Sequence, residues 1–566
     1  MACSKIFSGD LPELINEILP YLRNDYKTLY SCILVNRLWC RLAIPLLWED
    51  PFSKKFPKNY RFIEIYLHYL NDNDKAKLNE YGIITDSFPT NTLFNYPSFI
   101  KCLKIHEICL SIKLWNENIS FLTIKEQPGN FRKLTKDYNQ DMTLARFIFL
   151  LLTKIFIEYE ANLHTFEFKV LNTYWNKDIN DYIKSTFEII LQNPNFISNI
   201  KNLKFLSDGL ANNLLVFIFL KCIYSNCNSI SSLYIHALED NNADEDLSKL
   251  INSQQNLQKI YFDNSDYYYL KSLKNSNCLN TLRIIIFHNI YLYNLEVNLF
   301  SEVFEQLNVL ESVHILYCYP LDSTIIQLFN LTKPFKLKSL LMDQRSILQI
   351  EPLKLLLQKS GDYLENIGFE TSMNNELKLQ LLNLIKIYCF NIKFIDLNGF
   401  DNQNILPAFY LIKNIQRNLN YISINFAKFN YQNFDRHVEL SSFILRNLGQ
   451  ILPNRLEYLS LALKFNINDL EVFINNSQNI FIRKLLIKNI FYHTCENLLP
   501  CIKNSIMREK RVTYLAIENN HVFSNSERND LFDLKNEVEE FKLYGIQVTD
   551  YNNLYIKLHD FINELY

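Results

Sequence analysis

The segments LENIGF (364–369), IKFIDL (392–397) and LNYISI (419–424) share one pattern: apolar, two variable residues, apolar, variable, apolar. The number of such matches decides nothing, because many arise by chance in a long chain with abundant large apolar residues. The spacing is informative. Successive segments begin at 310, 337, 364, 392 and 419, at intervals of 27, 27, 28 and 27 residues. Chance matches would not keep this register, so the spacing predicts a structural repeat.

Related segments continue the pattern on both sides of this run. They are IKCLKI (100–105), LHTFEF (163–168), IKNLKF (200–205), ISSLYI (230–235), LQKIYF (257–262), LNTLRI (279–284), LESVHI (310–315), LKSLLM (337–342), LEYLSL (456–461), IRKLLI (482–487), VTYLAI (512–517) and VEEFKL (538–543). Alternating apolar residues predict a strand in each segment. Helix-like runs such as NELKLQLLNLIKIY (375–388) lie between them.

A period of 20–29 residues with this pattern resembles leucine-rich repeats. The resemblance covers residues 96–550 and implies an α/β solenoid with parallel strands on a concave face and helices on a convex face. It is degenerate, because the Asn that usually follows the strand is mostly absent or displaced. An insertion is expected at about 113–143, with a turn at EQPGN (126–130). Residues 551–566 are expected to form a capping helix that closes the end of the solenoid.

The beginning of the chain has a different pattern. In LPELINEILPYL (11–22) the large aliphatic residues are spaced by three and four, which predicts a helix with one apolar face. Asp10 and Glu13 form a capping-box pattern at its start. A second run from Asp25 suits further helices, and Pro45 is expected to end its periodicity.

Residues 11–50 resemble an F-box, through Leu-Pro-x-Glu at the start, Asp25 after a short turn, Val35-Asn36-Arg37 before Trp39, and the late Leu47-Trp48. The resemblance implies a three-helix domain (1–50) that docks on the Skp adaptor of a cullin-type ubiquitin ligase. A domain this small rarely buries enough apolar surface alone. By resemblance, adaptor contact falls on Leu11, Pro12, Leu14, Ile15, Ile18, Leu19, Val35 and Trp39. Residues 51–95 are expected to be a linker and the start of a solenoid cap.

An F-box followed by leucine-rich repeats resembles the substrate receptors of Skp–cullin–F-box ubiquitin ligases. Such a chain would bind the adaptor, reach the cullin through it, and hold a target protein without catalysing a reaction or needing a cofactor. Two alternatives stay open. One is a repeat-based scaffold or binding protein that acts outside a ligase. The other is an enzyme whose site is assembled from dispersed residues.

A column of aromatic residues is the candidate target-binding site. The residue before the second apolar position of each segment should face the concave side, which places Phe394, Tyr421, Tyr458 and Tyr514 in one row, with Lys484 between the last two. Aromatic residues are enriched at interface hot spots. The next row, Asp396, Ser423, Ser460 and Ala516, is small or polar and would leave room for a partner. Stacking for stability alone is the alternative explanation.

Composition excludes several classes of function. A net charge of −2 gives no general attraction to nucleic acid or anionic membranes. The nine glycines are too widely spaced for a phosphate-binding loop, a dinucleotide fingerprint or a nucleophile elbow. The cysteines have no Cys-x-x-Cys pair, and Cys222, Cys227 and His236 lack an evident fourth metal ligand. Without a secretory signal or an apolar span of membrane length, the cytoplasm and/or the nucleus is expected.

Overall fold

The computed structural model divides the chain into two compact units. Unit 1 comprises Met1–Ile260 and Asn275–Leu282, and unit 2 comprises Tyr261–Lys274 and Arg283–Tyr566. The boundary therefore falls inside the predicted repeats rather than at residue 50 or 95. The structure describes all residues except 1–11, 24, 54–59, 86–87, 89–90, 126–137, 171–185, 208–212, 237–242, 265–266, 293–295, 297, 322–326, 328–330, 347–349, 427–433, 491–498, 508–510 and 520–528.

Unit 1 begins with a small helical bundle, as expected for residues 11–50. It consists of α2 (Pro12–Ile18), the 3-10 helix η1 (Leu19–Leu22), α3 (Tyr26–Ile33) and α4 (Arg37–Trp48). The first helix ends at the predicted residue, although its last turn is 3-10. The expected end at Pro45 is wrong, because α4 continues through this proline to Trp48. Burial of Ile44 and Leu47 on both sides of Pro45 favours the helix there.

The segment after the bundle contains helices that the sequence did not indicate. They are η2 (Pro51–Ser53), α5 (Phe62–Leu67), α6 (Asp72–Glu80) and η4 (Tyr96–Phe99). Ile63, Tyr66 and Leu67 of α5 are fully buried. α6 is mostly polar and begins at Asn71, whose side chain accepts a hydrogen bond from the Asp74 amide (2.9 Å). The described residues between 51 and 95 therefore belong to the folded unit, so the expected linker there is wrong.

The strands of unit 1 form a parallel sheet. β1 (Cys102–Lys104) pairs with β2 (Thr165–Val170), β2 with β3 (Asn202–Ser207), and β3 with β4 (Ser232–His236). The expected insertion corresponds to the end of α7 (Ile105–Lys125) and the start of α8 (Tyr138–Glu158), while its EQPGN turn lies outside the described residues. Further helices of this unit are η6 (Pro194–Ile197), α10 (Asn213–Asn226), α11 (Ala243–Ser253) and η8 (Asn277–Asn280).

Unit 2 repeats the same alternation of strand and helix. β5 (Lys259–Asp263) has residues in both units. The following strands pair in parallel, each with the next along the chain: β6 (Ile284–His288), β7 (Ser312–Leu316), β8 (Leu337–Met342), β9 (Asn366–Phe369), β10 (Phe394–Asn398), β11 (Tyr421–Asn425), β12 (Arg455–Leu463), β13 (Phe481–Asn489) and β14 (Val512–Asn519).

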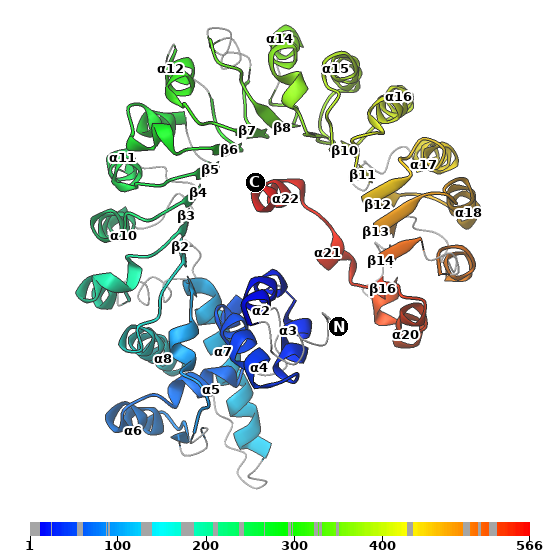
Figure 1. Cartoon of the computed structure of the whole chain (residues 1–566). Coiled ribbons are helices and arrows are strands. Elements are labelled where there is room, and N and C mark those ends of the chain that lie inside the picture. Colours follow the sequence, from blue (N-terminus) through cyan, green and yellow to red (C-terminus); the bar gives the residue numbers. More distant parts are fainter. Residues whose placement is uncertain are drawn as a thin grey trace. The chain divides into compact units, whose positions relative to one another are not determined.

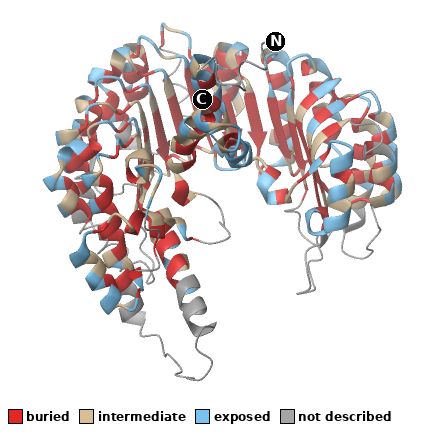
Figure 2. Cartoon of the chain, turned by 60° about the horizontal axis from the view of Figure 1, so that its bottom comes forward, coloured by how far each residue is buried: buried red, intermediate tan, exposed pale blue. Residues whose placement is uncertain are grey.

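The helices that connect the strands of unit 2 lie on the outer side of this sheet (Figure 1). They include α12 (Leu299–Gln306), α14 (Ile350–Ser360), α15 (Asn375–Tyr388), α16 (Ile405–Ile415), α17 (Phe434–Leu448), α18 (Ile467–Asn476) and α19 (Leu499–Ile502), with short turns η7 (Tyr267–Leu273), η9 (Gly361–Tyr363) and η11 (Lys503–Met507). In Figure 2 the strands are mostly buried, whereas the helices have one buried side and one exposed side. The α/β arrangement with solenoid-like repetition agrees with the prediction, and α15 has the predicted bounds.

Two of the predicted strand segments are wrong. LNTLRI (279–284) precedes its strand, because η8 occupies residues 277–280 and β6 begins only at Ile284. VEEFKL (538–543) lies in the helix α20 (Lys535–Leu543). Val538 and Phe541 are three residues apart, so both lie on the same side of this helix, where Phe541 is fully buried.

The predicted position of the C-terminal cap is also wrong. The edge of β14 is covered by β15 (Asn529–Asp530) and by β16 (Gln547–Val548). The 3-10 helix η12 (Leu531–Asp533) directly follows β15. Residues 551–566 instead form α21 (Tyr551–Leu554) and α22 (Leu558–Leu565), which lie on the inner face of the unit 2 sheet, opposite its helices (Figure 1). Because β15 and β16 pair with the backbone of β14, this edge of the sheet needs no further cover. The apolar side of α22 packs on the inner face of the sheet instead.

In the described part of the chain, no helix is long and apolar enough to cross a membrane. The described cysteines are all free thiols. No group of three or more His, Cys, Asp or Glu side chains is placed to hold a metal ion among the described residues.

We predict that Gly399→Ala destabilises the protein more than Gly545→Ala. Both glycines have a left-handed backbone (φ +65° and +80°), which costs an alanine roughly 1 kcal/mol. Only at Gly399 would the added Cβ lie 2.7 Å from Cγ2 and 2.8 Å from Cα of Thr371. Overpacking adds about 1–3 kcal/mol there. Urea unfolding of the two variants measures the difference, and equal midpoints would contradict the prediction.

Candidate protein-docking sites

The helical bundle of unit 1 has a complete core of its own. Buried members from all three helices pack together: Ile15, Leu19, Leu29, Cys32, Trp39, Ala43 and Leu47. The helix starts are capped by side chains. Asp25 accepts a hydrogen bond from the Thr28 amide (3.0 Å), and Asn36 accepts hydrogen bonds from the Leu38 and Trp39 amides (2.9 and 3.0 Å). These caps fix where α3 and α4 begin, so the bundle does not need a partner to define its helices.

A second apolar stripe on the first helix is exposed. Leu14 and Ile18 are 42% and 45% exposed, and Tyr21 of η1 is 90% exposed. Their spacing of four and three residues places them on one side of the helix. On α3, Tyr26, Tyr30 and Leu34 repeat at intervals of four, and Leu34 is 75% exposed. Large apolar side chains in such stripes are typical of protein interaction surfaces.

The structure separates the predicted adaptor contacts into two groups. Leu14, Ile18 and Val35 are exposed, and Pro12 is half-buried. Ile15, Leu19 and Trp39 are at most 8% exposed, so their assignment to direct contact is wrong, because they fill the bundle core. Leu11 lies outside the described residues. Tyr21, Tyr26, Tyr30 and Leu34 were not predicted, although the last three repeat at intervals of four residues in the sequence.

The bundle is joined to the first repeat through the end of α4. The backbone carbonyl of Glu49 accepts hydrogen bonds from the amides of Lys101 and Cys102 (3.0 and 3.2 Å), in the position that a preceding strand would take. Lys104 forms an ion pair with Asp50 (2.7 Å). The Trp48 ring packs 5.4 Å from Tyr66 and 4.3 Å from Tyr96, centroid to centroid. The exposed stripes are therefore carried on a bundle that is fixed to β1.

The predicted aromatic column exists in unit 2. Strand register pairs Phe394 with Tyr421, Tyr421 with Tyr458, Tyr458 with Lys484, and Lys484 with Tyr514. The Phe394 and Tyr421 rings stack with centroids 5.5 Å apart. The column is not open, however, since Phe394 and Tyr458 are 1% and 0% exposed. The chain itself therefore covers the surface that was expected to bind a target.

The covering segment is the C-terminal one, Tyr551–Tyr566, which we call the strap. At its start, Tyr551 and Leu554 pack in one cluster with Tyr458 and its neighbours. The Tyr458 hydroxyl accepts a hydrogen bond from the Ile556 amide (3.2 Å). Tyr551 lies 3.4 Å from the Ser460 hydroxyl, oxygen to oxygen. The small residues of the second row thus leave room that the strap fills.

Helix α22 of the strap covers the strands nearer the middle of unit 2. The Phe561 ring lies 5.4 Å from Phe394 and 4.9 Å from Tyr421. His559 stacks on His288 of β6 with ring centroids 4.9 Å apart. A Cβ on Gly368 would lie 2.8 Å from Cδ2 of Leu341 and 3.3 Å from Cδ2 of Leu558, so the glycine leaves space for both leucines.

The end of the strap is held by a polar cluster. The Tyr566 hydroxyl donates to Oε2 of Glu365 (2.7 Å), and Lys338 lies over the Tyr566 ring. Partial burial alone would raise the pKa of Glu365, but the bond from Tyr566 and those from Lys393 and Lys338 outweigh it and lower the pKa to about 2. The carboxylate is therefore ionised at neutral pH and holds the strap end.

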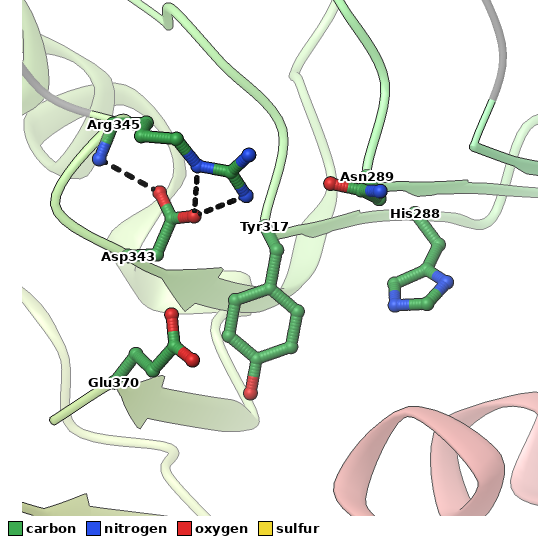
Figure 3. A pocket seen from close by; sticks show the side chains of 6 residues that line it. All are labelled: His288, Asn289, Tyr317, Asp343, Arg345 and Glu370. Carbon is green, nitrogen blue, oxygen red and sulfur yellow. Dashed lines mark hydrogen bonds and ion pairs between the residues drawn. The ribbon is translucent and has the colours of Figure 1, made fainter. Parts of the chain in front are cut away.

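One open pocket lies beside this surface, at the carboxyl ends of β6 to β9. Its volume is about 200 Å³, and it is lined by His288, Asn289, Tyr317, Asp343, Arg345 and Glu370 (Figure 3). Both Asp343 oxygens are occupied, one by the backbone amides of Arg345 and Ser346 (2.9 Å each) and the other by the Arg345 guanidinium (2.6 Å). Asp343 thus shapes a turn through both of its carboxylate oxygens.

No protein-family model matches this chain, and no curated protein matches it significantly. The candidate sites therefore rest on geometry and on the residue patterns.

Asp396 predicts a pH dependence of stability. Burial raises its pKa to about 6 from 3.8, although Asn398 donates a hydrogen bond to it (2.8 Å). The folded state therefore binds the proton more tightly, and stability is lost as the pH rises between these values. We predict that Asp396→Asn is roughly 1–3 kcal/mol more stable than wild type at pH 7.5, with a smaller gain at pH 4.5.

Urea unfolding at the two pH values measures this effect. Asp362→Asn, at an exposed carboxylate, is the matched control and should change stability little at either pH. A gain for Asp396→Asn that is the same at both pH values would contradict the prediction.

Proposed function

We propose that this protein is the substrate-recognition subunit of a Skp–cullin–F-box ubiquitin ligase. In this proposal the bundle at residues 12–48 is an F-box that binds the Skp adaptor, and the adaptor links the chain to the cullin. The repeats, which resemble leucine-rich repeats, hold a target protein for ubiquitination. The chain itself performs no bond chemistry, and it acts in the cytoplasm and/or the nucleus.

The observation that carries the proposal is the exposed stripe of Leu14, Ile18 and Tyr21 on a bundle whose core is already filled. If these residues were needed for folding, they would be covered by α3 or α4. Their exposure together with the F-box pattern of residues 11–50 supports a docking surface for a second polypeptide. Tyrosine side chains at its edge suit such a surface, since they are enriched at interface hot spots.

The junction at Glu49 supports the same function. A receptor must hold its target at a defined position relative to the ligase, so the adaptor-binding part must not swing freely. Two backbone hydrogen bonds, the Asp50–Lys104 ion pair and the rings around Trp48 join the bundle to β1. These contacts hold the bundle rigidly against β1, the first strand of the sheet in unit 1.

We predict that Leu14→Asp combined with Ile18→Asp abolishes binding to a purified Skp adaptor. Each side chain contributes roughly 1.5 kcal/mol or more when an interface buries it, so affinity should fall at least ~100-fold. Leu93→Asp is the matched control, because Leu93 is 91% exposed and lies outside the bundle. Co-purification and titration with the adaptor measure the effect, and circular dichroism checks the folding of each variant.

Unchanged adaptor binding by the folded double variant would contradict the proposed surface. A wild-type chain that never binds the adaptor would instead favour a repeat-based scaffold acting outside a ligase. Ile15 is unsuitable for this test, because it is 1% exposed and its replacement would unfold the bundle.

A further inference from the structure

The strap is a separate layer on the inner face of unit 2. It adds no strand to the sheet, whose last partners are β15 and β16. Its main regular element is the eight-residue helix α22. A helix of this length is marginal in water by itself, so the face beneath it supplies most of its stability.

The face beneath the strap is ordered by the sheet rather than by the strap. Parallel register aligns Phe394, Tyr421 and Tyr458, and it aligns Gly368, Asp396 and Ser423 in the next row. The surface under the strap, which we call the groove, consists of one row of aromatic side chains beside one row of small or polar side chains. Because pairing between the strands sets this register, the strap is not needed to align the two rows.

Strap and groove match at separate positions. Leu558 sits over the space left by Gly368, and Phe561 packs on Phe394 and Tyr421. Tyr566 completes the match at Glu365 through its hydroxyl. This is the pattern by which grooves read helical peptides, through apolar anchors on one side of a helix and a polar contact at its end.

Building on the proposed function, we infer that this groove is a peptide-binding site whose resident occupant is the strap, and that target proteins bind by replacing it. The partner chemistry follows from the occupant. A target segment would be an amphipathic helix with an aliphatic residue and an aromatic residue three positions apart, as Leu558 and Phe561 are, followed by a hydroxyl donor that reaches Glu365. The strap then sets a minimum affinity for targets, because a target must compete with a segment held at high effective concentration.

The test uses a fluorescein-labelled peptide of residues 549–566 and full-length protein. In the wild type the strap competes with the peptide, whereas Leu558→Asp with Phe561→Asp in the chain weakens the strap and frees the groove. We expect the double variant to bind the wild-type peptide at least ~10-fold more tightly than wild-type protein does. Glu564→Ala is the matched control on the exposed side of α22 and should behave as wild type.

Adding Tyr421→Asp to the double variant should remove peptide binding, because it places a charge in the groove. A folded double variant that does not bind the peptide would overturn the inference, as would equal binding by wild type and double variant. The assay contains no adaptor, so failure of peptide exchange leaves adaptor docking standing, and failure of docking leaves this result standing.

Hydrogen exchange of the unmodified protein is a second test of the inference, which can be used if the variants do not fold. A replaceable strap opens locally, so amides of residues 558–565 should exchange at least ~10 times faster than those of β10 to β12. Exchange of α22 as slow as that of these strands would mean that the strap is a permanent part of the core, and would overturn the inference.

Discussion

Helix α2 is apolar on two sides, and the proposed role of the protein depends on this property. Ile15 and Leu19 point into the bundle, where α3 and α4 cover them. Leu14 and Ile18 point outward and remain almost half exposed. A bundle of about forty residues has too little chain to cover both sides of its first helix. The uncovered side is the feature from which we propose a partner protein.

Unit 2 differs from the bundle, because its aromatic surface is covered by its own chain. The parallel register brings aromatic residues from successive strands into one column, which is both a source of stability and a surface suited to binding. The strap uses this surface in the folded chain. In the proposed exchange, a target and the strap compete for one groove, and the affinity of the strap would set the specificity for targets.

Much of the fold could be predicted because it depends on local periodicity. The strand segments alternate apolar residues at a nearly constant interval, and α15 lies between the predicted residues 375 and 388. The aromatic column followed from the same register, since equivalent positions of parallel strands lie side by side. The helices α5 and α6 escaped prediction because α6 is mostly polar and α5 is only six residues long.

The role of the strap could not be predicted from the sequence, because it depends on contacts between distant parts of the chain. The expected helix at residues 551–566 was correct only in part, because two helices form there, Tyr551–Leu554 and Leu558–Leu565. Phe561 meets Phe394 only after every intervening strand has formed. The same limit applied to the bundle. Periodicity placed Ile15 and Ile18 on one stripe, and only the packing of α3 and α4 decided which side chain would be buried.

In the proposed function, the outer side of α2 and α3 docks a Skp adaptor. Hydrogen exchange of the full chain, with and without purified adaptor, maps this contact without any substitution. We expect slower exchange in residues 12–35 on adding the adaptor and no change in the strands of unit 2. Slower exchange confined to the inner face of unit 2, or none anywhere in the chain at saturating adaptor, would contradict it.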